Sequence, residues 1–117
     1  MKVNSFKELI VWQKAIKLVN EIYSATKQMP KTEMYGLVSQ MQRAAVAIPS
    51  NIAEGYRRNH QREFIQFLGI AMGSAAELET QVVISKEQYS NIDYSRAEAL
   101  LEEVQKMLYS MIFKLKN

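Results

Sequence analysis

The chain of 117 residues has no cysteine. Disulfides, thiolate metal sites and cysteine nucleophiles are therefore excluded. It has one histidine, His60, and no glutamate stands three residues before it. The Glu-x-x-His motif that holds metals in helical bundles is thus missing. Glu77 and Glu79 are two residues apart and would point to different sides of a helix. We expect no metal and no cofactor.

Other features of enzymes and membrane proteins are also missing. No glycine-rich phosphate loop and no set of acid, base and nucleophile can be recognised from spacing, so we predict a non-enzyme. No uninterrupted run approaches the roughly 18 apolar residues of a membrane span, so no membrane is expected. Residues 1–8 become charged where a signal peptide would become apolar. These features predict a cytoplasmic protein.

Only four glycines and two prolines are present, which leaves room for few loops. In four segments of the chain, apolar residues recur three or four positions apart, as they do on one face of an α-helix. The apolar series are Leu9, Trp12, Ile16, Val19, Tyr23; Leu37, Met41, Ile48, Ile52; Phe64, Leu68, Ala71, Ala75, Leu78, Val82; and Leu101, Val104, Leu108, Met111, Leu115. No useful length of strand alternation appears. The pattern predicts a single all-α domain, residues 1–117, folded as an antiparallel up-down four-helix bundle.

Short polar residues mark where each helix should begin. The predicted N-caps are Ser5 with Glu8, Thr32, Asn59, and Ser95 with Glu98. Pro30 should stop the first helix, because the residue before a proline is pushed toward extended geometry. Gly55 should end the second helix in a left-handed conformation.

The second helix contains a proline in its interior. Pro49 removes the backbone hydrogen bond to the carbonyl of Ala45, at a cost on the order of 3 kcal/mol relative to alanine. Small residues surround it, so close packing of a neighbouring helix can compensate. A second apolar stripe on the third helix includes Ile65, Met72 and Val83. Because a lone bundle needs one inward stripe per helix, the extra stripe predicts self-association.

The chain resembles the four-helix-bundle family of proteins encoded in intervening sequences of bacterial 23S ribosomal RNA genes. The resemblance runs from residues 6–15 to the last helix, and its strongest parts are residues 40–45, 63–68, 73–79 and the segment Ile48-Pro49-Ser50-Asn51-Ile52-Ala53-Glu54-Gly55. It implies a bundle that assembles as a ring-like homopentamer. It also implies kinship with the accessory protein of diversity-generating retroelements, a basic pentameric bundle that works with nucleic acid. The family's biochemical role is not established.

Four basic residues cluster at the turn between the second and third helices: Arg57, Arg58, His60 and Arg62. Such a cluster can grip phosphates, with Tyr56 beside it to stack on an unpaired base. Alternatively, these arginines form a solvated turn and pair with nearby carboxylates such as Glu54 and Glu63. A looser basic set is interspersed with glutamates and is typical of a solvated surface: Lys14, Lys17, Lys106, Lys114 and Lys116.

The polar side of the second helix predicts a network between helices or subunits. Its members are Gln40, Arg43, Ser50, Asn51 and Glu54. Arg43 could reach Glu77 or Glu79, and Ser50 or Asn51 could serve the backbone groups that Pro49 frees. Such networks specify register and partner more than they add stability.

Together these features predict a non-enzymatic, oligomeric binding module. A homopentameric ring would present its arginines to structured RNA or to another nucleic acid, whether RNA or DNA. The net charge of +3 permits this without requiring it. The alternative is a protein-interaction scaffold with no nucleic-acid role, whose basic residues only solubilise the ring.

Overall fold

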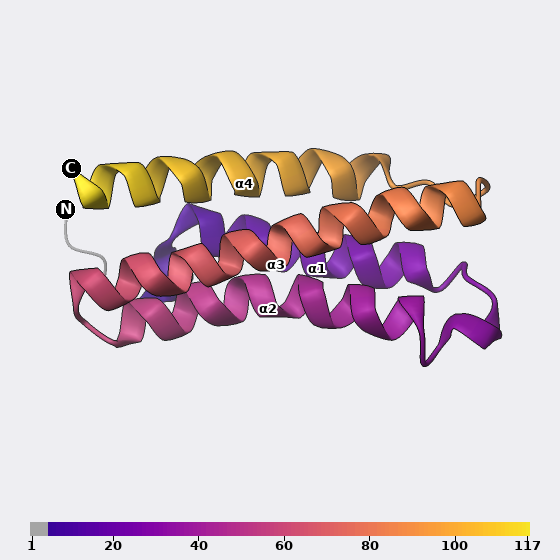
Figure 1. Ribbon diagram of the computed structural model, residues 1–117, viewed down its shortest axis with the longest axis horizontal. Coiled ribbons are helices and arrows are strands. Elements are labelled where there is room, and N and C mark those ends of the chain that lie inside the picture. The colour runs from indigo at the N-terminus through magenta and orange to yellow at the C-terminus, as the bar shows by residue number, and fades with distance from the viewer. Residues whose placement is uncertain (1–4) are drawn as a thin grey trace.

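The computed structural model describes residues 5–117. Its elements are the 3-10 turn η1 (Phe6–Glu8), α1 (Ile10–Thr26), the 3-10 turn η2 (Lys31–Glu33), α2 (Leu37–Arg57), α3 (Gln61–Gln88) and α4 (Ser95–Lys116). Successive helices run in opposite directions, and each packs on its neighbours in the chain while α4 closes against α1 (Figure 1). The described bundle measures 45 × 21 × 20 Å. The predicted up-down four-helix bundle is confirmed.

The core runs the length of the bundle and receives side chains from all four helices. Its largest fully buried members are Leu18, Ile22, Met41, Ile48, Ile52, Leu68, Leu78 and Leu108. In α2, α3 and α4 these buried positions belong to the predicted apolar series. In α1 the predicted series is wrong: the buried stripe is Val11, Ala15, Leu18 and Ile22, and Tyr23 of the predicted series is 40% exposed. Each of the large buried side chains contributes roughly 1.5–3 kcal/mol on leaving water, which stabilises helices that would be marginal alone.

Gly55 does not end α2. We expected a left-handed glycine there, but the helix continues through Arg57 and no described glycine has positive φ. A Cβ atom at Gly55 would lie 2.6 Å from the Cβ of Phe67 and 3.2 Å from Cδ1 of Phe64. Gly55 is therefore needed for the close approach of α2 to α3, the most extensive helix contact in the bundle.

Pro49 is buried inside α2, and the helix runs through it. We expected Ser50 or Asn51 to serve the backbone groups it frees. Instead, Nδ2 of Asn51 donates to the carbonyl of Ala47 at 2.7 Å, whereas Pro49 leaves the carbonyl of Ala45 without its usual donor. Ser50 is exposed. Packing against neighbouring helices, rather than a replacement hydrogen bond, therefore keeps the helix intact.

The predicted N-caps of α1 and α2 are wrong, because a 3-10 turn precedes each helix. The Ser5 hydroxyl accepts from the amide of Lys7 at 3.1 Å and so caps η1, while α1 begins after Leu9. Before α2, a carboxylate oxygen of Glu33 accepts from the amide of Leu37 at 3.2 Å, and Thr32 lies within η2.

The caps of α3 and α4 also differ from the prediction. Asn59 has φ 60° and forms the turn, and His60 occupies the position before α3 without a side-chain cap. At α4, Ser95 is the first helical residue rather than the cap. Its amide donates to Oδ1 of Asp93 at 2.9 Å, and this bond holds the pKa of Asp93 below its ordinary value.

Candidate nucleic-acid interface

The turn between α2 and α3 brings the predicted basic cluster together on the surface. α2 ends at Arg57, and Asn59 takes the left-handed conformation that asparagine tolerates better than most residues. The chain then reverses into α3 at His60. All four predicted residues, Arg57, Arg58, His60 and Arg62, are exposed.

Arg57 is held against an aromatic ring. Its guanidinium carbon lies 5.3 Å from the centre of the Phe6 ring. Phe6 in turn meets Trp12 edge to face, with ring centres 5.4 Å apart. A cation over an aromatic face is attracted by the ring's negative charge density, so Phe6 orients the Arg57 side chain.

Arg58 is engaged by the protein itself. Its guanidinium lies 3.2 Å from Glu54 and 3.5 Å from Glu63, and it sits 5.1 Å from the ring centre of Phe67. Two carboxylates offset its charge, as the solvated-turn alternative requires. Such exposed ion pairs contribute about 0–1 kcal/mol each, so Arg58 stabilises the turn weakly and offers little charge to a ligand.

Arg62 has no ion pair within residues 5–117, so its charge is open to solvent. His60 lines a hollow of about 290 Å³ together with Tyr56 and Asn59. Tyr56 packs edge to face against Phe64, with ring centres 6.0 Å apart. The aromatic residue that we proposed for stacking is thus partly used by the core beneath the turn.

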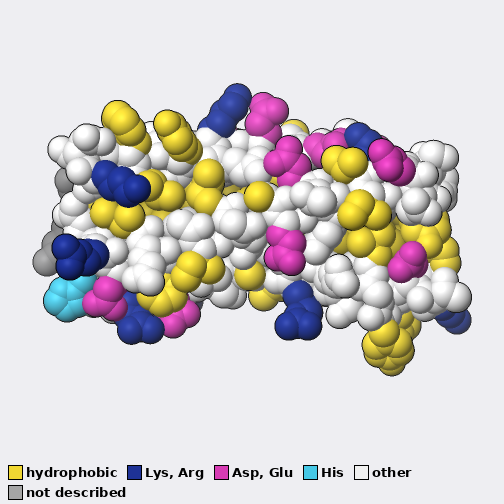
Figure 2. Space-filling model, in the orientation of Figure 1, with side chains coloured by type: hydrophobic (Ala, Val, Ile, Leu, Met, Phe, Trp, Pro, Cys, Tyr) yellow, Lys and Arg dark blue, Asp and Glu magenta, His cyan; other side chains and the backbone are white. Residues whose placement is uncertain are grey.

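The end of α4 joins this cluster, which we did not predict. The side-chain amide of Gln61 donates to the carbonyl of Leu115, so Lys114 and Lys116 lie at the same end as the α2–α3 turn. We define the basic end as residues 5–8, 54–63 and 114–117. It holds six lysines and arginines against three glutamates, and its blue side chains and cyan histidine appear at the left of Figure 2. The up-down topology alone places the end of α4 beside the α2–α3 turn, so this neighbour could have been predicted.

Within one chain, the polar residues of α2 do not form one network, and a network between subunits stays a prediction. Gln40 and Arg43 border a hollow of about 380 Å³ with Glu77, but no ion pair joins Arg43 to an acid in the described part of the chain. Glu54 is bound to Arg58, and Asn51 is bound to its own helix. Glu79, the other acid we considered for Arg43, accepts a hydrogen bond from Gln105 of α4 at 3.0 Å.

The outer face of α3 exposes apolar side chains on either side of the exposed residues Glu77 and Thr80. We define it by Ile70, Gly73, Ala76, Val83 and Ile84, all of which are exposed. By length and composition α3 could cross a membrane, but the core helix of a soluble bundle meets the same criterion. Only 33% of its most apolar stretch is buried in the bundle, so much of its apolar surface has no partner in one chain. The absence of a membrane and the cytoplasmic location stay predictions.

The groups whose pKa values are shifted lie at the end of the bundle opposite the basic end, where hydrogen bonds and burial cause the shifts. The Tyr89 hydroxyl donates to Glu33, which lowers the pKa of Glu33 and raises that of Tyr89. Burial raises the pKa of Tyr94, partly opposed by its hydrogen bond with Ser85 at 2.6 Å. Within residues 5–117 no cluster of metal-ligating side chains is present.

The family model for 23S rRNA-intervening sequence proteins matches residues 7–110. The chain belongs to this family. A crystal structure of a protein of unknown function from the S23 ribosomal protein family of Bacteroides thetaiotaomicron has the same fold, with a TM-score of 0.74. That protein is 23% identical, and the match covers 88% of this chain and 98% of the other. None of the curated proteins matches the chain.

Proposed function

We propose that this family member is a non-enzymatic, oligomeric module that binds structured RNA or another nucleic acid through its basic end. The observation that carries the proposal is the gathering of cations from three separate segments at one end of the bundle. Arg57 is oriented by Phe6 and Arg62 has no ion pair among the described residues. Phosphate contacts of this kind position a nucleic acid without reading its sequence.

The proposed oligomer forms through the outer face of α3. Burial of its exposed side chains, such as Ile70, Val83 and Ile84, would contribute a hydrophobic driving force. The number five comes from the family resemblance. A ring would repeat the basic end on one side, and linked weak contacts raise overall affinity well above that of a single copy.

Binding is tested by fluorescence anisotropy of labelled structured RNA across a salt series. In Arg57→Glu/Arg62→Glu we expect weaker binding and a shallower salt dependence, with the logarithmic slope reduced by roughly one to two units. Lys17→Glu/Lys106→Glu is the matched control, because it makes the same charge change outside the basic end. Equal affinity and slope in the two double variants would refute the basic end as the binding site.

Assembly is tested by sedimentation of the purified chain. A pentamer should have a mass of about 68 kDa, five times the 13.5 kDa chain. Ile70→Glu/Ile84→Glu should give folded monomers, because it places charges on the face that the neighbour would cover. Tyr109→Glu changes another exposed apolar side chain, on α4, and should leave the mass unchanged. A folded wild-type monomer at micromolar concentration would refute the ring.

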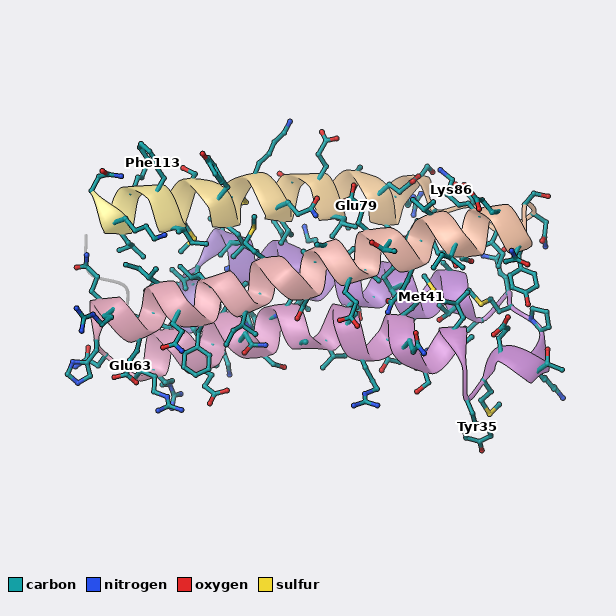
Figure 3. All side chains as sticks on the ribbon, in the orientation of Figure 1. Tyr35, Met41, Glu63, Glu79, Lys86 and Phe113 are labelled. Carbon is teal, nitrogen blue, oxygen red and sulfur yellow. The ribbon has the colours of Figure 1, made fainter. Side chains whose placement is uncertain are left out.

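The alternative function is a protein-interaction scaffold. It is favoured by Tyr109 and Phe113, which are 65% and 59% exposed one helical turn apart on α4. Phe113 points away from the bundle (Figure 3). An apolar contact there would survive high salt and charge reversal at the basic end. Absence of RNA binding even at low salt would make the scaffold the leading function.

A further inference from the structure

A second surface, distant from the basic end, runs along α1 and α2. Two hollows of about 420 and 400 Å³ lie there, and both are bordered by Ser39 and Gln42, so they form one continuous groove. We call it the α1–α2 groove. It begins at the turn between the two helices and passes along α2 as far as Ala47.

The floor of the groove is fixed by hydrogen bonds. The side-chain amide of Gln42 donates to the Thr26 hydroxyl at 3.2 Å, which bridges α2 to α1. That hydroxyl donates in turn to the carbonyl of Ile22 at 2.8 Å. Thr26 is buried, so this bridge holds the two helices at a set separation and the groove is preformed.

The charge of the groove has one sign. Lys27, Lys31 and Arg43 line it, and no carboxylate does. None of these three cations forms an ion pair within residues 5–117, in contrast to Arg58. Two acids lie outside this lining. Glu33 accepts from Tyr89 and Leu37, and Glu77 borders an adjoining hollow that shares Arg43 and Ala47 with the groove.

Two exposed aromatic rings accompany these cations. Tyr35 is 93% exposed and points away from the bundle between Lys31 and α2 (Figure 3). Tyr23, on the opposite wall, is 40% exposed. Nothing within the described chain covers the Tyr35 ring. Cations that follow a groove, together with open aromatic rings, are the combination by which proteins hold unpaired nucleotides.

We propose that the α1–α2 groove binds single-stranded nucleic acid. Lys27, Lys31 and Arg43 contact phosphates, and bases stack on Tyr35 and Tyr23. A duplex could use the cations but keeps its base faces stacked. An acidic peptide could use the cations but would need aromatic residues of its own, suitably spaced, to use both rings. An unpaired strand uses both features. The inference does not rest on the proposed function, because it involves other residues and another form of nucleic acid.

The test is fluorescence anisotropy of a labelled twelve-nucleotide oligouridine with the full chain between 50 and 200 mM salt. Three phosphate contacts predict a logarithmic salt slope of about −2. Tyr35→Ala should weaken binding by roughly 5- to 150-fold, the range for loss of one stacked base, whereas Tyr35→Phe should stay close to wild type. Lys27→Ala/Lys31→Ala should weaken binding and flatten the slope by about 1.4 units.

Matched controls separate the groove from other surfaces. Tyr109→Ala removes an aromatic ring that is 65% exposed on α4, and Lys17→Ala/Lys106→Ala removes two cations outside the groove. Both should bind as wild type does. Arg57→Glu/Arg62→Glu should also retain most oligouridine binding, so failure of the basic end would leave the groove proposal standing.

Four outcomes would overturn the groove proposal. The first is no binding of oligouridine at 50 mM salt, and the second is binding by Tyr35→Ala as tight as that by Tyr109→Ala. A changed sedimentation mass for Tyr35→Ala would make the groove a contact between copies of the chain. A labelled oligoglutamate peptide that binds as tightly as oligouridine, with no effect of Tyr35→Ala, would make it a site for acidic peptides.

Discussion

A single methyl group added at Gly55 is expected to separate α2 from α3. In Gly55→Ala the new Cβ would lie 2.6 Å from the Cβ of Phe67, where ordinary contacts begin at 3.4 Å. Because the Phe67 Cβ is fixed to the backbone, a rotamer change cannot relieve the clash, and the helices must move apart by about 0.8 Å. Overpacking of this kind costs about 1–3 kcal/mol. Alanine returns about 1 kcal/mol of helix propensity, so we expect a net loss of up to about 2 kcal/mol.

The matched control is the same substitution at Gly69, where no atom lies within 4 Å of the added Cβ. There the propensity gain of about 1 kcal/mol should appear alone. Urea denaturation followed by circular dichroism should therefore place the two variants on opposite sides of wild type. Sedimentation of each variant should also be measured, so that a change in oligomeric state is not mistaken for a change in the stability of the bundle. Equal stabilisation by both substitutions would refute the close approach of α2 and α3 at Gly55.

Three further predictions concern single side chains. The Gln81 side-chain carbonyl is buried without a partner in the described chain, so Gln81→Met should raise the free energy of unfolding by about 1 kcal/mol; a loss in urea denaturation would contradict this. Tyr89→Phe removes the bond that lowers the pKa of Glu33 and raises that of Tyr89. The Glu33 contribution is present above its ordinary pKa of 4.5 and lost as pH falls, and the Tyr89 contribution is present below its ordinary pKa of 10.0 and lost as pH rises. Tyr89→Phe should thus be less stable than wild type at pH 7, and the difference in the free energy of unfolding should shrink in acid and in strong base. A difference that does not depend on pH would show that the Glu33–Tyr89 hydrogen bond is not its cause. Asn59→Ala should destabilise by about 1 kcal/mol while Asn59→Gly stays near wild type, because φ at Asn59 is 60°; thermal melts in which both variants match wild type would contradict the role of this turn.

The fold was predictable because burial follows a period that is local in sequence. Ile48, Leu68 and Leu108 are fully buried members of the predicted series, and no distant information is needed to see that spacing. Helix ends were less predictable, since a cap depends on which amide the backbone presents. Thr32 has the side chain of a cap, but the η2 turn places Glu33 nearer the amide of Leu37.

The candidate site was only partly predictable for a related reason. The sequence places Arg57, Arg58 and Arg62 on one turn, but it cannot tell a free guanidinium from a paired one. Arg58 lies between two carboxylates, one contributed by each helix of the turn. Gly55 was misassigned because its role depends on Phe67 across the helix pair, a contact that has no signal in local spacing.

The two proposed nucleic-acid surfaces lie toward opposite ends of a bundle 45 Å long, with Glu63 near one end and Tyr35 near the other (Figure 3). Neither surface can compensate for the other within one chain, because each contact to phosphate is local and exposed charges are screened beyond about 8–10 Å. An RNA with a folded part and an unpaired tail could engage both, and linkage would then raise its affinity above that of either part. Charge reversal at the basic end and Tyr35→Ala should each weaken binding of such an RNA by nearly the full factor seen with the corresponding fragment, because the linked affinity is proportional to both site affinities. Two sites that are not engaged together would instead give much smaller losses on the joined RNA, because the unaltered site would still hold it.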